Sequence, residues 1–183
     1  MLSIVVMYPD QNLGFVILTN TQNGGAGLFS AVANTISDSY LGLDDFGWTD
    51  KMVGWMKEDK NSGEDVTKKV WEKVAASKNI KVKNEDFIGV YKDNWFGEIE
   101  VFEKNKQLWF KSYRSPKLNG PMAFYNANTF AIKWEYQAMD CDAFAMFSLD
   151  ETGKAQSIKM KGISPSIDFS FDFQDLDLVR VQK

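Results

Sequence analysis

The spacing of apolar residues changes near residues 78–84, and this change most constrains the fold. In most of the chain before it, apolar side chains recur at helical spacing. After it, they alternate with polar residues in short runs separated by turn residues, which is typical of strands buried on one face. The clearest alternation lies in residues 167–173. We therefore predict two domains, residues 1–80 and residues 85–183.

The C-terminal domain carries the strand pattern almost without interruption. The strand candidates are residues 87–92, 95–103, 107–112, 122–125, 129–135, 143–149, 155–161, 167–173 and 176–181. Eight or nine short strands, each apolar on one face, within roughly 100 residues are typical of an antiparallel barrel or sandwich. The short connections favour an up-and-down barrel.

The N-terminal domain begins with a predicted β-hairpin. Residues 2–8 and 13–19 are strand candidates, and a Pro-Asp-Gln-Asn turn separates them. The second candidate is apolar at successive positions rather than at alternate ones. We therefore expect an interior strand whose two faces are both covered.

Two or three helices are predicted after this hairpin. Four apolar residues of the first helix fall at four-residue steps, namely Leu28, Val32, Ile36 and Tyr40. Gly42 can end this helix. A short helical piece is expected over residues 52–55, a polar break over 59–63 and an amphipathic helix over 64–77. The predicted fold class is α+β, with a hairpin and helices followed by an antiparallel barrel of about eight strands.

The composition excludes several kinds of chemistry. The chain has no histidine, which removes Ser-His-Asp catalysis, Cys-His catalysis and imidazole metal sites. Its single cysteine, Cys141, has no partner for an intrachain disulfide, and we expect it to pack in an apolar strand. With a net charge of −4 and no basic stripe, the chain is not expected to bind nucleic acid. No run approaches the roughly 18 apolar residues of a transmembrane helix, and residues 1–10 lack the pattern of a signal peptide.

The remaining nucleophile and carboxylate patterns do not form a catalytic set. Without histidine, a nucleophilic serine would need the S-x-x-K pattern, and no serine has a lysine three positions later. Four carboxylates stand at strand spacing, namely Glu98, Glu100, Asp168 and Asp172. Strand alternation assigns them to the solvent face. We therefore predict no catalytic residue, no metal site and no cofactor.

Residues 9–20 read Pro-Asp-Gln-Asn-Leu-Gly-Phe-Val-Ile-Leu-Thr-Asn, and a predicted helix over 31–38 follows, then Tyr-Leu-Gly-Leu at 40–43 and Trp48. This stretch resembles the end of the β-lactamase-related serine hydrolases, which include class C β-lactamases, penicillin-binding-protein-like peptidases and esterases. The resemblance implies that the hairpin is the last one of the enzyme's core sheet, and that the helix packs across that sheet.

Four short motifs follow in the C-terminal part: Ile-Gly-Val-Tyr at 88–91, Phe-Gly-Glu-Ile-Glu-Val at 96–101, Gln-Leu-Trp-Phe at 107–110 and Asn-Thr-Phe at 128–130. They resemble the C-terminal domain of unknown function that is often appended to these hydrolases. The resemblance implies a lipocalin-like barrel, in agreement with the strand pattern.

The catalytic motifs of the hydrolase family have no counterpart in this sequence. S-x-x-K, Y-x-N and K-T-G all lie upstream of the hairpin in the family, so no catalytic residue can be carried over. The chain is expected to be the C-terminal part of such a hydrolase, without activity of its own. The resemblance implies a parent enzyme in the periplasm or elsewhere outside the cytoplasm.

Two functions fit this sequence. In the first, the barrel is a non-catalytic accessory module that shapes active-site access or subunit contacts in the parent enzyme. In the second, the barrel holds one small apolar ligand. The residues that would line it are Tyr91, Trp95, Trp109, Phe130 and Trp134. Alternatively, these side chains simply fill the interior. The expected partners are the missing catalytic part, or a second copy that associates through residues 1–40.

Overall fold

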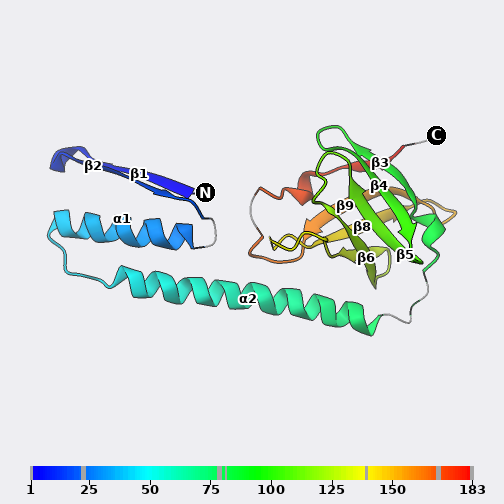
Figure 1. The fold of residues 1–183 in the computed structure, drawn as a ribbon, viewed down its shortest axis with the longest axis horizontal. Helices are drawn as coiled ribbons and strands as arrows, with labels where there is room; N and C mark the ends of the chain where they lie inside the picture. Colours follow the sequence, from blue (N-terminus) through cyan, green and yellow to red (C-terminus); the bar gives the residue numbers. More distant parts are fainter. Residues whose placement is uncertain are drawn as a thin grey trace. The chain divides into compact units, whose positions relative to one another are not determined.

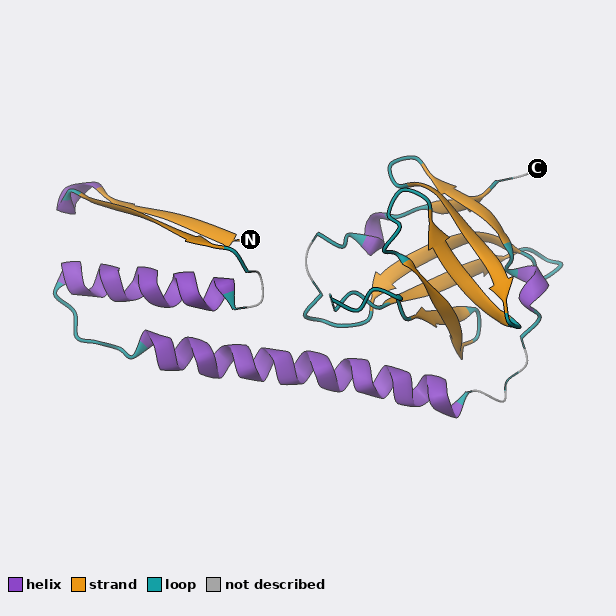
Figure 2. Ribbon diagram, in the orientation of Figure 1, coloured by secondary structure: helices purple, strands orange, loops and turns teal. Residues whose placement is uncertain are grey.

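A computed structural model of the chain describes residues 2–21, 24–77, 80, 82–138, 140–167 and 170–181. The chain divides into two compact units, residues 1–62 and residues 63–183, and the division falls within helix α2 (Trp48–Ala76). The first unit holds a two-stranded sheet and the second holds a closed barrel of eight strands (Figures 1 and 2). The predicted α+β class is confirmed.

The hairpin of the first unit joins β1 (Leu2–Tyr8) to β2 (Leu13–Thr19) through the short 3-10 helix η1 (Pro9–Gln11). Asn12 ends this turn in the left-handed region at φ 48°, where its N–H bonds to the carbonyl of Pro9. The strands pair in antiparallel register from Leu2 with Thr19 to Tyr8 with Leu13. The predicted hairpin therefore forms.

Only one face of this hairpin is covered within the first unit. Helix α1 (Gly25–Leu41) packs on the inner face, and the hydroxyl of Tyr8 donates to Oγ of Ser37 at 2.9 Å. The outer face is apolar and exposed, with Val5 at 63%, Met7 at 74%, Val16 at 57% and Leu18 at 77%. The sequence pattern of β2 suits a strand covered on both faces, but the outer face has no covering layer among the described residues of this unit.

The helices differ from the prediction at one point. Helix α1 ends as expected at Gly42, which takes a left-handed conformation at φ 70°. The predicted break over residues 59–63 is wrong, since α2 runs through it without interruption. This segment contains no proline. Gly63 is buried, and a Cβ on it would lie 2.6 Å from Oγ of Ser166, so its missing side chain allows a close approach to the barrel.

The second unit is a closed antiparallel barrel in the order β10-β3-β4-β5-β6-β7-β8-β9. Its strands are β3 (Gly89–Asp93), β4 (Gly97–Lys104), β5 (Gln107–Ser112), β6 (Asn119–Asn126), β7 (Thr129–Ile132), β8 (Ala143–Leu149), β9 (Ala155–Gly162) and β10 (Leu178–Arg180). Each of the first seven strands pairs with the next in sequence, and β10 inserts between β9 and β3. The up-and-down barrel is confirmed.

One predicted strand does not form. Ser170 to Asp172 are irregular, and the 3-10 helix η3 (Phe173–Asp175) follows, while Asp168 and Phe169 lie outside the described residues. Phe173 is buried and stacks on Trp134, with 6.1 Å between the ring centroids. The alternation of apolar and polar residues around Phe173 therefore does not mark a strand. It belongs to a segment outside the sheet, from which Phe173 covers the core.

Aromatic side chains in mutual contact fill much of the barrel interior. Phe87, just after the 3-10 helix η2 (Asn84–Asp86), lies 4.9 Å from both Phe130 and Phe147, measured between ring centroids, in edge-to-face geometry. Phe110 contacts Trp134 in the same way at 5.4 Å. Packing of this kind stabilises a small barrel without leaving an open channel through it.

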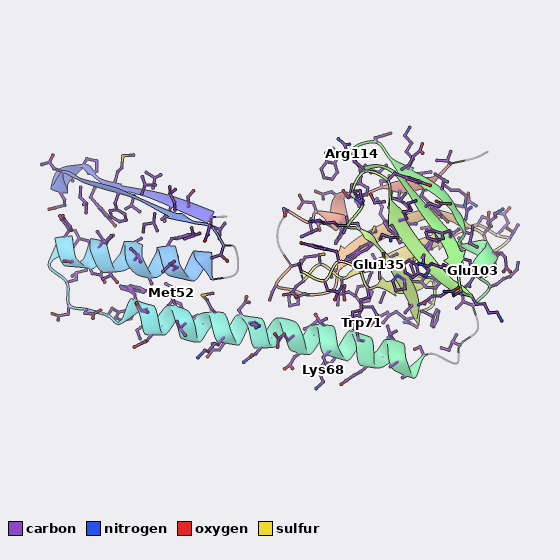
Figure 3. The ribbon with its side chains drawn as sticks, viewed as in Figure 1. Met52, Lys68, Trp71, Glu103, Arg114 and Glu135 are labelled. Atoms are coloured by element: carbon purple, nitrogen blue, oxygen red, sulfur yellow. The ribbon has the colours of Figure 1, made fainter. Side chains whose placement is uncertain are left out.

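The second half of α2 packs on the outside of this barrel. Val70 and Val74 are buried in a cluster with Ala131 and Ile163. The indole of Trp71 points from the helix to the barrel (Figure 3) and donates to Oδ2 of Asp142 at 3.1 Å. This part of the helix thus belongs to the core of the second unit.

Arg180 fastens the closing strand β10. Its guanidinium donates to the carbonyls of Ile88 (2.8 Å), Asp86 (3.2 Å) and Ala155, and to the hydroxyl of Tyr91 (2.8 Å). Tyr91 in turn donates to the carbonyl of Phe87 at 2.7 Å. Burial raises the pKa of Tyr91 to about 12, against the lowering effect of the Arg180 charge.

We expect Tyr91→Phe to lower the free energy of unfolding by about 1–3 kcal/mol, because it leaves the buried carbonyl of Phe87 without its donor and removes one acceptor of Arg180. Chemical denaturation followed by far-UV circular dichroism measures the change. The effect should shrink as the pH rises from 10 towards 12, since a folded-state pKa above the ordinary 10.0 stabilises the protein only while the hydroxyl is protonated.

Tyr113→Phe is the matched control, since Tyr113 is exposed and its hydroxyl donates to Glu100 at 2.6 Å. Its cost should stay below about 0.5 kcal/mol. Equal losses in the two variants would show that the hydroxyl of Tyr91 has no special role in closing the barrel.

Candidate functional site

The structure separates the five aromatic residues that were predicted to line a ligand cavity. Tyr91, Phe130 and Trp134 are buried in the barrel interior, where they contact other core side chains. The indole of Trp134 donates to the carbonyl of Cys141 at 2.6 Å. These three residues serve the packing of the core in the described structure.

Trp109 lies on the outer surface of the barrel, so its assignment to the lining is wrong. It is flanked on β5 by Leu108 and Phe110, which are both buried, and side chains alternate along a strand. Its ring lies 6.4 Å from that of Phe102, and Nζ of Lys104 stands 4.0 Å above it.

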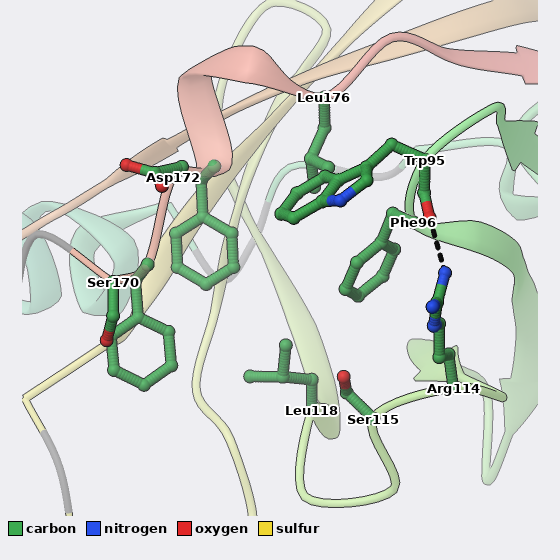
Figure 4. Close-up of a pocket in the computed structure, with 10 residues that line it drawn as sticks. Trp95, Phe96, Arg114, Ser115, Leu118, Ser170, Asp172 and Leu176 are labelled. Carbon is green, nitrogen blue, oxygen red and sulfur yellow. Dashed lines mark hydrogen bonds between the residues drawn. The ribbon is translucent and has the colours of Figure 1, made fainter.

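Trp95 lies at the end of the barrel rather than inside it. It belongs to the turn between β3 and β4, and its side chain is 64% exposed. It borders a cavity of about 400 Å³, shown in Figure 4. The lining residues are Trp95, Phe96, Arg114, Ser115, Leu118, Ser170, Phe171, Asp172, Phe173 and Leu176. This cavity is the candidate functional site.

Two aromatic pairs form opposing walls of the cavity. Trp95 and Phe96 form the first, with ring centroids 6.4 Å apart, and Phe171 and Phe173 form the second, with centroids 5.8 Å apart. In Figure 4 Ser170 and Asp172, the chain neighbours of the second pair, lie across the cavity from Trp95 and Phe96. The stack of Phe173 on Trp134 joins the second wall to the core. The cavity therefore offers flat apolar surfaces on two sides.

Asp93 connects the turn that carries the first wall to the segment before β10. Its carboxylate accepts the backbone N–H groups of Trp95 and Phe96, each at 2.7 Å, and that of Asp177 at 2.8 Å. Burial by itself would raise the pKa of Asp93, but these three hydrogen bonds and the nearby charge of Lys159 outweigh it and lower the pKa below its ordinary 3.8. The carboxylate is therefore ionised at neutral pH and joins the turn after β3 to the segment before β10.

Asp93, Phe96 and Arg114 were not among the site residues predicted from the sequence. A signal for the turn was present, because Asp-Asn-Trp-Phe-Gly at 93–97 combines an aspartate that can bond to following N–H groups with a glycine, found here at φ 88°. Nothing in the sequence connected this turn with Asp177, which lies 84 positions away.

The other chemically notable groups do not assemble into a reactive site. Cys141 is buried as expected, although it lies just before β8 and not within a strand, and burial, with the charges of Asp142 and Asp140, raises the pKa of its thiol to about 11. It is thus a protonated thiol at neutral pH and a poor nucleophile. Asp172 is exposed, and Asp168 lies outside the described residues. Within the described ranges, no three or more Cys, Asp or Glu residues gather as metal ligands.

Among the described residues, neither α1 nor α2 is both long and apolar enough to cross a bilayer.

The barrel matches a known protein family. The family described as a domain of unknown function (DUF3471) matches residues 76–180, which is more than half of the chain. The chain belongs to the DUF3471 family. The match begins at the end of α2 and includes all eight strands, so the DUF3471 domain coincides with the barrel. Comparisons with curated proteins and with solved structures found no match.

We expect Asp93→Asn to lower the free energy of unfolding by about 1–3 kcal/mol, because an amide cannot replace a carboxylate that accepts three N–H groups. Since the pKa of Asp93 is lowered in the folded protein, its contribution is present above the ordinary 3.8 and is lost as the pH falls through the folded-state pKa. The difference between the two proteins should therefore shrink in acid, as measured by denaturation at several pH values.

Asp175→Asn provides the control, because Asp175 is an exposed aspartate of η3 close to the same site. A change within about 0.5 kcal/mol is expected. If Asp93→Asn is no more costly than this control at neutral pH, the Asp93 carboxylate does not stabilise the connection between the turn after β3 and the segment before β10.

Proposed function

We propose that this chain is the C-terminal part of a β-lactamase-related serine hydrolase and that its barrel is a non-catalytic accessory module. The match to DUF3471 carries this proposal, since domains of this family are known at the C-termini of β-lactamase-related proteins. In the parent enzyme the barrel would shape access to the active site or contacts between subunits.

The open hairpin of the first unit supports the proposal. The sheet of β1 and β2 has only two strands, and such a hairpin is marginally stable by itself. Its outer edges can accept further strands, and its exposed outer face can accept further apolar side chains. A catalytic domain that continues this sheet would supply both.

Helix α1 supports the same conclusion. Leu28, Val32 and Tyr40, three residues of its predicted apolar face, are exposed. The buried positions of α1 are instead small residues: Gly25, Gly27, Ala31, Ala33 and Ser37. The helix therefore keeps an apolar face available for a layer beyond the described residues of its own unit.

The chemistry of the described residues fits an accessory role. The S-x-x-K, Y-x-N and K-T-G motifs are missing from the sequence. Tyr113, Arg114 and Ser115 follow one another, but Tyr113 bonds to Glu100 and Ser115 donates its N–H to Oγ of Ser112 at 3.0 Å. Neither hydroxyl has a lysine or histidine as its hydrogen-bond partner among the described residues, so neither is activated as a nucleophile by such a base.

We expect the purified chain to hydrolyse neither a chromogenic β-lactam nor a p-nitrophenyl ester above the buffer rate, because it lacks an activated nucleophile. Absorbance assays measure both reactions. Turnover that survives stringent purification and falls in proportion to an added covalent serine inhibitor would contradict the accessory role.

The genomic DNA upstream of the Met1 codon tests the origin of the chain. An in-frame coding segment with S-x-x-K and Y-x-N is expected there. An upstream frame that encodes an unrelated protein, or none, would overturn the assignment to a hydrolase.

We also expect the chain to self-associate when the catalytic part is absent, because the outer hairpin face and the strand edges are open. Light scattering over a concentration series measures this. The double variant V16K and L18K should reduce the mean mass towards that of a monomer, since it puts two charges on the outer face.

Val179→Lys is the matched control, since Val179 is 52% exposed on β10 of the barrel and lies outside residues 1–40. It should leave the association unchanged. A monomeric unsubstituted chain at high concentration would show that the hairpin face does not recruit a second copy.

A further inference from the structure

The cavity between the two aromatic walls has the size and lining of a small-molecule site. Its volume of about 400 Å³ lies within the range of cavities that bind ligands of drug-like size. The opposing pairs Trp95–Phe96 and Phe171–Phe173 suit a flat aromatic group placed between them.

The walls are positioned before any ligand binds. Asp93 accepts the N–H groups of Trp95 and Phe96 in the first wall and that of Asp177, which lies four positions after Phe173. Phe173 is held by its stack on Trp134. A site with fixed walls loses little conformational entropy on binding, which favours affinity for a small ligand.

Polar groups border this apolar space on one side, in the loop between β5 and β6. The loop is held by hydrogen bonds from the N–H of Ser115 to Oγ of Ser112 (3.0 Å) and from the N–H of Leu118 to the carbonyl of Ser115 (2.8 Å). In Figure 4 the Ser115 hydroxyl lies beside Leu118, and Arg114 lies beside Phe96. Both are hydrogen-bond donors, and one carries a positive charge.

The donors of Arg114 are largely uncommitted. Its hydrogen bond among the described residues goes from Nη1 to the carbonyl of Trp95 at 2.5 Å, and a guanidinium has five N–H groups. The acidic residue of the lining, Asp172, lies on the opposite side, and its carboxylate points away from Trp95 in Figure 4. Asp172 also accepts a hydrogen bond from Gln174 at 3.3 Å. The charge available to a bound ligand is therefore positive.

We propose that this cavity binds a small aromatic carboxylic acid. The aromatic ring lies between Trp95 with Phe96 and Phe171 with Phe173, and the carboxylate accepts hydrogen bonds from Arg114 and Ser115. The site differs from the barrel interior, which its own side chains occupy. The proposal does not depend on the accessory role, because every residue it uses belongs to the second unit.

A titration of the whole chain with N-acetyl-phenylalanine and with its uncharged amide tests this proposal. Tryptophan fluorescence and two-dimensional ¹H–¹⁵N NMR report binding, with the exposed indole of Trp95 as a local probe. We expect saturable binding with a Kd in the millimolar range or below, as befits a ligand of this size. The acid should bind about three- to fivefold more tightly than the amide, because the charge pair is partly exposed.

Substitutions of exposed residues separate the two parts of the site. R114Q should remove the preference for the acid, so that the acid and the amide bind the variant with about equal affinity. W95A should weaken binding of both compounds about fivefold or more, since it removes one side of the aromatic wall. K161Q, at an exposed lysine of β9 that does not line the cavity, should change neither. Circular dichroism checks that each variant is folded.

NMR shifts in the unsubstituted chain give a test that does not depend on the variants. They should cluster on residues 93–96, 114–118 and 171–176. The proposal is overturned if neither compound saturates at about 50 mM, if the shifts centre elsewhere, or if R114Q keeps the preference for the acid. A cavity that only receives an apolar side chain of a partner domain would give the first of these results.

Discussion

The closure of the barrel depends on β10, a strand of only three residues. Strand β10 pairs with β3 and with β9 through two residue pairs each, which is little backbone pairing for a strand that closes a sheet. Arg180 adds side-chain hydrogen bonds that hold β10 in place. Its guanidinium donates to carbonyls on both sides of the closure and to the hydroxyl of Tyr91. A Cβ on Gly89 would collide with the guanidinium, so a glycine at this position is part of the same arrangement. Without this closure, β3 and β9 would become open edges.

The same closure builds the candidate site. Asp93 ends β3 and accepts the N–H of Asp177 just before β10, and it also accepts the N–H groups of Trp95 and Phe96, which line the cavity. Phe173 faces the cavity and also stacks on Trp134 in the core. The stability of the barrel end and the shape of the cavity therefore rest on shared residues. A ligand that binds between the walls would stabilise the closure by mass action.

The two units differ in whether the edges of their sheets are paired. The barrel pairs each of its strands on both sides, whereas β1 and β2 pair only with each other among the described residues. The hairpin also keeps Val5, Met7, Val16 and Leu18 exposed. A small sheet of this kind gains stability when another layer or strand completes it. Among the described residues, the first unit therefore leaves strand edges and an apolar face open, whereas the DUF3471 barrel has no unpaired strand.

The sequence by itself determined where side chains alternate and where helices can end. In β5 and β8 the period of two separates buried from less buried residues, and Gly42 ends α1, because these features depend on neighbours along the chain. Tertiary structure decided the features that need distant partners. Residues 170–173 carry a strand-like pattern, but their aromatic side chains cover the barrel end instead. Trp95 and Trp109 look alike in sequence, yet one borders the cavity and the other the outer surface. Asp93 connects the turn after β3 to the segment before β10 only because it accepts the N–H of Asp177, which lies 84 positions away. Local sequence carries no information about this contact, because the closing of the barrel creates it.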